Sequence, residues 1–203
     1  MFLQVFQGRV TDAQQVRQLL DQWVERLSPG AEGWLGSTAG VTDDGTFVAA
    51  ARFESAEAAE RNSARAQQGE WWSAVSKLFD GAPEFHNCSE VDVARGGGSD
   101  QAGFVQVIQG RAVNLPRLRE LAGDFERRFP DVRPDLLGFL VGYHDGEDGA
   151  FTQVAYFVSE EEARLSERQE PPPEVAEVLR EEMALIQDAR YYDLRRPWMD
   201  SSR

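Results

Sequence analysis

The stretch FLQVFQGRV at residues 2–10 returns as FVQVIQGRA at residues 104–112, and six of the nine positions are identical. The second copy begins 104 − 2 = 102 residues after the first, about half the length of this 203-residue chain. Self-similarity at a fixed offset is typical of a repeated structural unit. Both copies alternate large apolar residues with other residues, which predicts a β-strand at the start of each half.

An amphipathic helix is expected after each of these strands. Residues 11–14, Thr-Asp-Ala-Gln, have the form of a capping box that opens a helix. Apolar residues then recur at helical spacing over residues 16–27 and again over residues 118–129. The offset of 102 matches Trp23 with Phe125, so the apolar face is kept while other positions change.

A hairpin and a second helix complete each half. The Asp-Asp-Gly turn at residues 43–45 indicates a hairpin, and its counterpart at residues 145–149 is two residues longer. The offset between the halves therefore rises to 104, which matches Ser55 with Ser159 as N-caps of the second helices. A strand-like stretch closes each half, at about residues 84–93 and 189–196.

Each half thus follows the order strand, helix, strand, strand, helix, strand. This is the ferredoxin-like βαββαβ pattern, an antiparallel sheet with both helices on one face. The apolar residues Phe2, Phe6, Phe47 and Phe53 then need cover on the other face of the sheet. We therefore predict an α+β protein of two ferredoxin-like βαββαβ repeats, packed sheet to sheet as an intramolecular pseudo-dimeric α/β barrel.

A glycine-rich segment separates the two halves. Residues 95–100 read Arg-Gly-Gly-Gly-Ser-Asp, a composition typical of a flexible linker. We predict a first repeat over residues 1–94, a linker over 95–103 and a second repeat over 104–203. Further association of whole chains into a homo-oligomer is left open by the sequence.

The composition narrows the class of partner. The formal net charge is −14 and both halves are acidic, which argues against nucleic acid or an anionic membrane surface as a partner. No apolar run approaches the roughly 18–20 residues that span a bilayer. Cys88 is the only cysteine, so the chain cannot form an internal disulfide. Met1 leads into a strand without the features of a signal peptide, and we expect a cytoplasmic protein.

Residues 52–59, Arg-Phe-Glu-Ser-Ala-Glu-Ala-Ala, resemble the antibiotic-biosynthesis-monooxygenase-like (ABM) domain of the dimeric α/β-barrel superfamily. In that family an aromatic residue, an acidic residue and a serine often precede a helix rich in Glu and Ala. The Trp71-Trp72 pair is similar to the aromatic-rich second part of the same helical region. The resemblance implies a pocket between the sheet and its helices, where cofactor-independent monooxygenases oxidise aromatic or quinol-like substrates with dioxygen.

A second branch of that family degrades haem and holds the iron with a histidine late in the second helix, beside an asparagine on the first strand. In this sequence Trp71 and Trp72 stand where that histidine would be expected, and Gln4 stands on the first strand. The only histidines, His86 and His144, are expected in a strand and in a hairpin. We predict that the protein binds neither haem nor a metal ion and needs no cofactor.

Asn62 and the two adjacent tryptophans are candidate residues of the pocket. Asn62 falls on the inward stripe of its helix, where its amide could position a substrate hydroxyl or stabilise an enolate-like oxygen. The alternative is an amide bonded to nearby backbone. Trp71 and Trp72 could stack on a flat aromatic substrate, or belong to the core, since the apolar pattern continues to Phe79.

Further candidates lie on the strands. Gln4 and Gln106 recur at equivalent positions on the face of the aromatic residues, where they could contact a ligand or each other. His86 is a candidate general base, or an ordinary strand residue. Arg52 could bind an anionic or phenolic oxygen, or form a surface salt bridge. We assign catalytic roles to Asn62 and His86, and substrate-binding roles to Gln4, Arg52, Trp71 and Trp72.

The two halves are expected to be unequal, with one working pocket per chain in the first half. Three prolines at residues 171–173 must break the second helix of the second half. We predict an ABM-like protein that binds a small apolar or aromatic molecule as a cofactor-independent monooxygenase. Alternatively, it is a non-catalytic ligand-binding or structural barrel. The offset of 104 matches Asn62 with Ser166, Trp71 with Val175, and Trp72 with Ala176.

Overall fold

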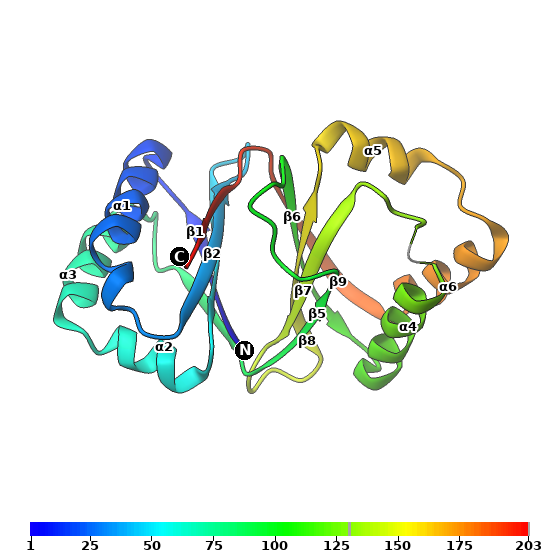
Figure 1. The fold of residues 1–203 in the computed structure, drawn as a ribbon, viewed down its shortest axis with the longest axis horizontal. Helices are drawn as coiled ribbons and strands as arrows, with labels where there is room; N and C mark the ends of the chain where they lie inside the picture. Colours follow the sequence, from blue (N-terminus) through cyan, green and yellow to red (C-terminus); the bar gives the residue numbers. More distant parts are fainter. Residues whose placement is uncertain (130, 203) are drawn as a thin grey trace. The chain divides into compact units, whose positions relative to one another are not determined.

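The computed structural model describes residues 1–129 and 131–202, and it has the α+β class predicted from the sequence. The described residues form two five-stranded antiparallel sheets, each in a compact unit of its own (Figure 1). The first unit comprises Met1–Val91 and the C-terminal segment from Arg196, and the second comprises Asp92–Arg195. Within each unit the helices lie on one face of the sheet (Figure 1), as the ferredoxin-like pattern requires.

The sheet of the first unit has the strand order β10-β2-β3-β1-β4. One-turn 3₁₀ helices follow two of its helices, at Ser28–Gly30 and Ser76–Leu78. The elements of this unit are β1 (Phe2–Arg9), α1 (Ala13–Arg26), β2 (Trp34–Val41), β3 (Thr46–Phe53), α2 (Ala56–Ser63), α3 (Ala66–Val75), β4 (Glu84–Cys88) and β10 (Trp198–Ser201).

The sheet of the second unit repeats this arrangement with the order β5-β7-β8-β6-β9. No helix within residues 1–129 and 131–202 is long and apolar enough to cross a membrane. The elements of this unit are β5 (Glu90–Ala94), β6 (Phe104–Ala112), α4 (Leu115–Arg128), β7 (Leu136–Tyr143), β8 (Ala150–Phe157), α5 (Glu160–Arg168), α6 (Pro173–Ala184) and β9 (Ile186–Leu194).

Side-chain caps explain where the helices begin. Ser55 and Ser159 accept hydrogen bonds from backbone N–H groups three residues further on, at 3.3 and 3.2 Å, so both predicted caps are confirmed. Helix α1 begins one residue later than the capping box predicts, because Asp12 is its N-cap and accepts a backbone hydrogen bond at 2.9 Å. The Thr11 hydroxyl instead donates to the Leu78 carbonyl at 3.1 Å.

The large aromatic residues of the first sheet face the helices, which corrects the face assigned to them from the sequence. Phe2 belongs to a buried cluster with Trp23 of α1 and with α2, and Phe6 belongs to a second cluster with α1 and α3. Because side chains alternate along a strand, Leu3 and Val5 point to the helix-free face. Both faces of the sheet are therefore apolar, and the larger set lies under the helices.

Two edge strands pair in a different sheet from the one that the sequence predicts for them. Strand β5 follows β4 after a single residue, yet it forms an edge of the second sheet. Strand β10, at the end of the second predicted repeat, pairs with β2 at an edge of the first sheet. The two compact units therefore differ from the predicted contiguous repeats 1–94 and 104–203, because each sheet takes one edge strand from the other half of the sequence.

The predicted linker is packed at its start. The Arg95 guanidinium donates to the Glu126 carboxylate at 2.9 Å and to the backbone carbonyls of Arg133 and Leu136 at 2.7 and 3.1 Å. Gly97 is buried, and its carbonyl lies where a side chain at Gly138 of β7 would stand. Residues 95–97 of the predicted linker thus contact β7 and the residues beside it.

Candidate functional site

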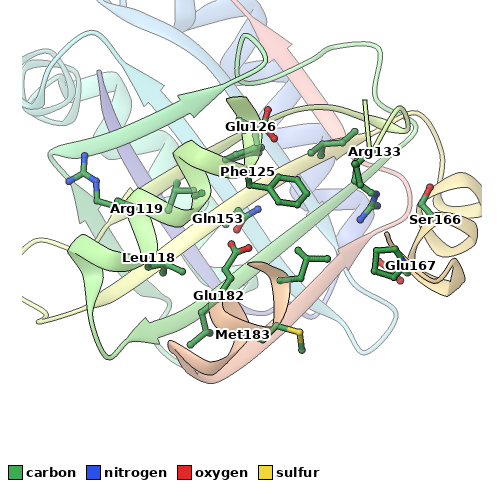
Figure 2. A pocket seen from close by; sticks show the side chains of 18 of the residues that line it. Leu118, Arg119, Phe125, Glu126, Arg133, Gln153, Ser166, Glu167, Glu182 and Met183 are labelled. Atoms are coloured by element: carbon green, nitrogen blue, oxygen red, sulfur yellow. The ribbon is translucent and has the colours of Figure 1, made fainter. Parts of the chain in front are cut away.

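A cavity of about 590 Å³ lies in the second unit, between the helix-side face of the sheet and α4 and α6 (Figure 2). Pockets of this size accommodate a small organic ligand, and apolar walls with few polar groups are typical of them. The cavity also reaches the segment between α5 and α6 that carries the prolines. Its apolar wall includes Leu118, Phe125, Leu136, Phe139, Val141 and Phe151.

The last helices of the two units correspond with an offset of 107. The backbone N–H of Thr11 donates to the Leu78 carbonyl, and the N–H of Val113 donates to the Leu185 carbonyl, both at 2.9 Å. Thr11 and Val113 correspond by the offset of 102, so Leu78 corresponds to Leu185, and 185 − 78 = 107. The first residues of α3 and α6 give the same value, since 173 − 66 = 107.

This offset corrects the pairing of the tryptophans. With 107, Trp71 corresponds to Val178 and Trp72 to Leu179, where the sequence analysis matched them with Val175 and Ala176. The cause lies in the connection before the last helix. Both units break the helical region, but α2 and α3 are separated by residues 64–65, whereas α5 and α6 are separated by the longer, proline-containing segment 169–172.

Tryptophans fill the corresponding space in the first unit. The ring centroids of Trp71 lie 6.3 Å from Trp23 and 6.2 Å from Trp72, and Trp72 packs edge-on against Phe6 at 5.6 Å. The second unit has smaller residues at these places, and the proline segment displaces the chain. Indole rings therefore occupy in the first unit the volume that is open in the second, and a working pocket in the first half stays a prediction.

Two polar side chains without partners among the described residues enter the cavity from opposite walls. Gln153 comes from β8 and Glu182 from α6, and both point into the cavity (Figure 2). No hydrogen bond or ion pair from another described residue reaches either side chain. Burial raises the pKa of the Glu182 carboxyl above its ordinary value of 4.5. A half-buried carboxyl with no counter-charge can accept a proton from a ligand or donate one to it.

The arginines that line the cavity are already paired. Arg133 forms an ion pair with Asp135 at 2.7 Å, and the Ser166 hydroxyl donates to the same carboxylate at 2.9 Å. Burial alone would raise the pKa of Asp135, but the hydrogen bonds and charge of Arg133 hold it below its ordinary value. Arg119 pairs with Asp92 at 2.7 Å. The cavity therefore presents no free cation to an anionic ligand among the described residues.

The predicted site residues on the helix side of the first sheet are held by partners within the unit. The Asn62 amide oxygen accepts from the Arg65 guanidinium at 2.8 Å, and Asn62 is 6% exposed. The Trp71 indole N–H donates to the Leu19 carbonyl at 2.8 Å. The Gln4 amide donates to the Asn87 side chain at 2.9 Å, and Gln106 bonds to Asp193 in its own sheet at 2.8 Å.

Arg52 and His86 lie on the opposite face of the first sheet. In the antiparallel registers Arg52 stands opposite Leu3 and His86 stands opposite Val5, so both share the helix-free face. The sheet therefore separates His86 from Asn62, the other residue with a predicted catalytic role. The structure does not bring the six predicted residues into one site, and their catalytic and substrate-binding roles stay predictions.

A second pocket, of about 600 Å³, lies in the first unit beside the end of α1 and β10. It contains none of the predicted site residues. Six of its ten lining residues are polar or charged, including Asp21, Glu25 and Asp200, which makes it a weaker candidate for an apolar ligand. The larger apolar lining of the second-unit cavity is the reason to prefer that cavity.

Sequence reasoning missed Gln153 and Glu182. A signal for Gln153 existed in the repeat, because it stands where the first half has an apolar residue. Gln153 stands opposite Ile108 as Ala49 stands opposite Phe6, so Gln153 corresponds to Ala49. Glu182 corresponds to Val75 only with the offset of 107, which the sequence alone did not reveal.

Comparisons with solved structures identify the fold. A candidate monooxygenase from Lactobacillus acidophilus NCFM matches with a TM-score of 0.74 and 11% identity, covering 98% of this chain and 98% of its own. A second, from Fusobacterium nucleatum subsp. nucleatum, has a TM-score of 0.76 and 10% identity, with 99% and 94% covered. An anthrone oxidase-like protein has a TM-score of 0.68 and 11% identity, with 100% and 91% covered.

Sequence comparisons give no closer relation. No protein-family model matches the sequence, and no curated protein matches it. Identities of 10–11% show the fold and do not transfer an activity. Over its full length this chain therefore shares the fold of these two candidate monooxygenases and of the anthrone oxidase-like protein.

Proposed function

We propose that this protein binds a flat, apolar molecule of the aromatic or quinol-like class in the cavity of the second unit and oxidises it as a cofactor-independent monooxygenase. The observation that carries the proposal is the cavity itself, about 590 Å³ with mainly apolar walls. The first unit, whose corresponding volume is filled by Trp71 and Trp72, then serves as scaffold. This assigns one binding site to each chain.

The chemistry needs no group beyond the substrate and dioxygen. An activated aryl methylene can react according to R₂CH₂ + O₂ → R₂C=O + H₂O, in which the substrate supplies all the electrons. One oxygen atom enters the product and the other leaves as water. The protein has to bind the substrate away from bulk water and accept a proton, which an apolar cavity with a carboxyl group can do. The full-length likeness to candidate monooxygenases supports this reading.

A non-catalytic binding protein is the alternative. It is favoured by the pairing of polar side chains in the first unit, where Asn62 bonds to Arg65 and Gln4 bonds to Asn87. In that case the cavity holds its ligand without turnover. Oxygen uptake separates the two functions, because only the enzyme consumes dioxygen in step with product formed.

Filling the cavity tests the proposal. Leu179→Trp places in the second unit the indole that Trp72 supplies in the first, and it should abolish binding of a tricyclic aryl ketone measured by calorimetry. The reciprocal variant Trp72→Leu is the matched control and should bind with unchanged affinity. Wild type should bind one molecule per chain and consume one O₂ per product. Unchanged binding by Leu179→Trp would show that the ligand lies elsewhere.

A further inference from the structure

At one place in the second unit, two polar residues stand where the first unit has buried core residues. Ala49 and Val75 belong to the same buried cluster and are 3% and 0% exposed. Their counterparts, Gln153 and Glu182, both line the cavity. A polar group kept in an apolar site is costly unless a partner is supplied, and neither has one among the described residues. Both side chains are half-buried, so their polar groups can form hydrogen bonds with a ligand in the cavity.

The other ionisable groups of the cavity lining have partners or stand in solvent. The Arg119, Arg133 and Glu126 side chains are in ion pairs, and the Tyr143 hydroxyl donates to Asp92 at 2.7 Å. Glu167, which is exposed, pairs with Arg164 at 3.0 Å, and Glu170 is exposed. Among the described lining residues, Glu182 is thus the one half-buried carboxyl without a partner.

We propose that Glu182 is the catalytic proton acceptor of the cavity and that Gln153 orients the oxygen of the substrate beside it. This inference rests on the proposed function and names its substrate class. The substrate is a flat, uncharged aryl ketone or phenol with one weakly acidic C–H or O–H group. An anion formed before binding is disfavoured, because the cavity offers it an unpaired carboxyl and no free cation.

The reaction can be written with every atom placed. Glu182 takes one proton from the methylene carbon, and the C–H electron pair moves onto the carbonyl oxygen, where the Gln153 amide donates a hydrogen bond. Dioxygen takes up an electron pair from this enolate in two single-electron steps, and a C–O bond forms to give a peroxide. The second methylene proton then leaves, the O–O bond breaks, and the departing oxygen is released as water with the two protons.

The position of Glu182 suits this role. Its carboxyl enters from α6, opposite the β8 wall that carries Gln153 (Figure 2). Burial makes the carboxylate a stronger base than an exposed one, because the charged form is less well solvated. The same apolar surroundings strengthen the hydrogen bond from Gln153 to developing negative charge. Both effects are absent from the first unit, where alanine and valine stand at these positions.

Anaerobic hydrogen–deuterium exchange tests proton abstraction apart from oxidation. Anthrone, an uncharged tricyclic aryl ketone, is incubated with the protein in D₂O without oxygen, and loss of the methylene signal is followed by NMR. Wild type should accelerate the exchange over buffer, and Glu182→Gln should lower that acceleration by about 100-fold or more. Glu177→Gln, an exposed position on the same helix, is the control and should exchange like wild type.

Two further readouts separate the outcomes. Binding of anthraquinone, which has no methylene proton, should persist in Glu182→Gln and weaken in Gln153→Ala. Wild-type oxygen uptake retained by Glu182→Gln would overturn the role of Glu182 while leaving the proposed function standing. Exchange without any oxygen uptake would support Glu182 and overturn the oxygenase. Failure of wild type to bind either tricycle would overturn both.

Discussion

The backbone carbonyl of Asp200 lies 2.6 Å from the position that a side-chain Cβ would take at Gly36. Gly36 stands in β2, and Asp200 belongs to β10, the strand that comes from the other end of the sequence. Gly36 also has a φ of +145°, a conformation that residues with a side chain rarely adopt. The glycine is thus a requirement of this strand pairing. At its repeat counterpart Gly138, an added side chain would likewise meet a backbone carbonyl, that of Gly97.

Gly36→Ala should therefore destabilise the first unit. We expect the free energy of unfolding to fall by about 2 kcal/mol or more, because both the backbone conformation and the contact with Asp200 become strained. Urea unfolding measures this loss. The control is Gly69→Ala in α3, where no atom lies within 4 Å of the added methyl group, and there we expect a gain of up to about 1 kcal/mol. Equal effects of the two substitutions would contradict the pairing of β10 with β2.

Asn62 should matter for stability more than for ligand binding. Asn62→Ala removes the acceptor of the Arg65 guanidinium from a buried position, which should cost about 1–2 kcal/mol in unfolding free energy. Binding to the second-unit cavity should keep its affinity. Ser166, at the corresponding position of the second unit, itself lines the cavity and donates to Asp135, so Ser166→Ala should change ligand affinity. Loss of turnover in Asn62→Ala without loss of stability would instead support its predicted catalytic role.

Glu182 should make stability depend on pH. Because its pKa is raised in the folded state, the fold holds this proton to a higher pH than the unfolded chain does. The loss of folding stability caused by the charged Glu182 carboxylate is therefore absent below the ordinary pKa of 4.5. It grows as the pH rises through the folded pKa. Glu182→Gln should unfold like wild type at pH 4 and be more stable at pH 8, by about 1 kcal/mol. Urea unfolding at both pH values checks this, and Glu177→Gln should show no such difference.

The sheet-to-sheet packing predicted from the sequence can be tested through the single thiol. Cys88 stands opposite Leu3 in the β1–β4 register, so its side chain shares the helix-free face of the first sheet. If that face is covered, the Cys88 thiol should react with Ellman's reagent only on unfolding. Ser73→Cys adds a thiol at an exposed position of α3 and should react at once. Rapid reaction of Cys88 in the native protein would contradict the predicted barrel.

The sequence alone determined the repeated ferredoxin-like order of elements. Alternation in residues 2–10, the helical spacing around Trp23 and the caps at Ser55 and Ser159 are local signals, since each depends on neighbours within a few residues. Their recurrence at a fixed offset identified the tandem repeat. The class of fold followed from these signals; the structure confirms it, and the comparisons find the same fold in candidate monooxygenases.

Only the tertiary structure decided which strands share a sheet and where a cavity remains open. The placement of β5 and β10 depends on edge pairing between distant segments, which no local pattern encodes: Trp198 of β10 pairs with Ala39, 198 − 39 = 159 residues away, and β5 lies beside β7, at least 136 − 94 = 42 residues away. In the sequence, the apolar residues of the helices recur at helical spacing in both halves. Whether the core closed on Trp71 and Trp72 or left space around Glu182 depended on side-chain volumes from several elements, and on the longer connection before α6 that shifted the offset to 107. Packing depends on side-chain volumes throughout the unit. Only the tertiary structure therefore shows where the cavity lies.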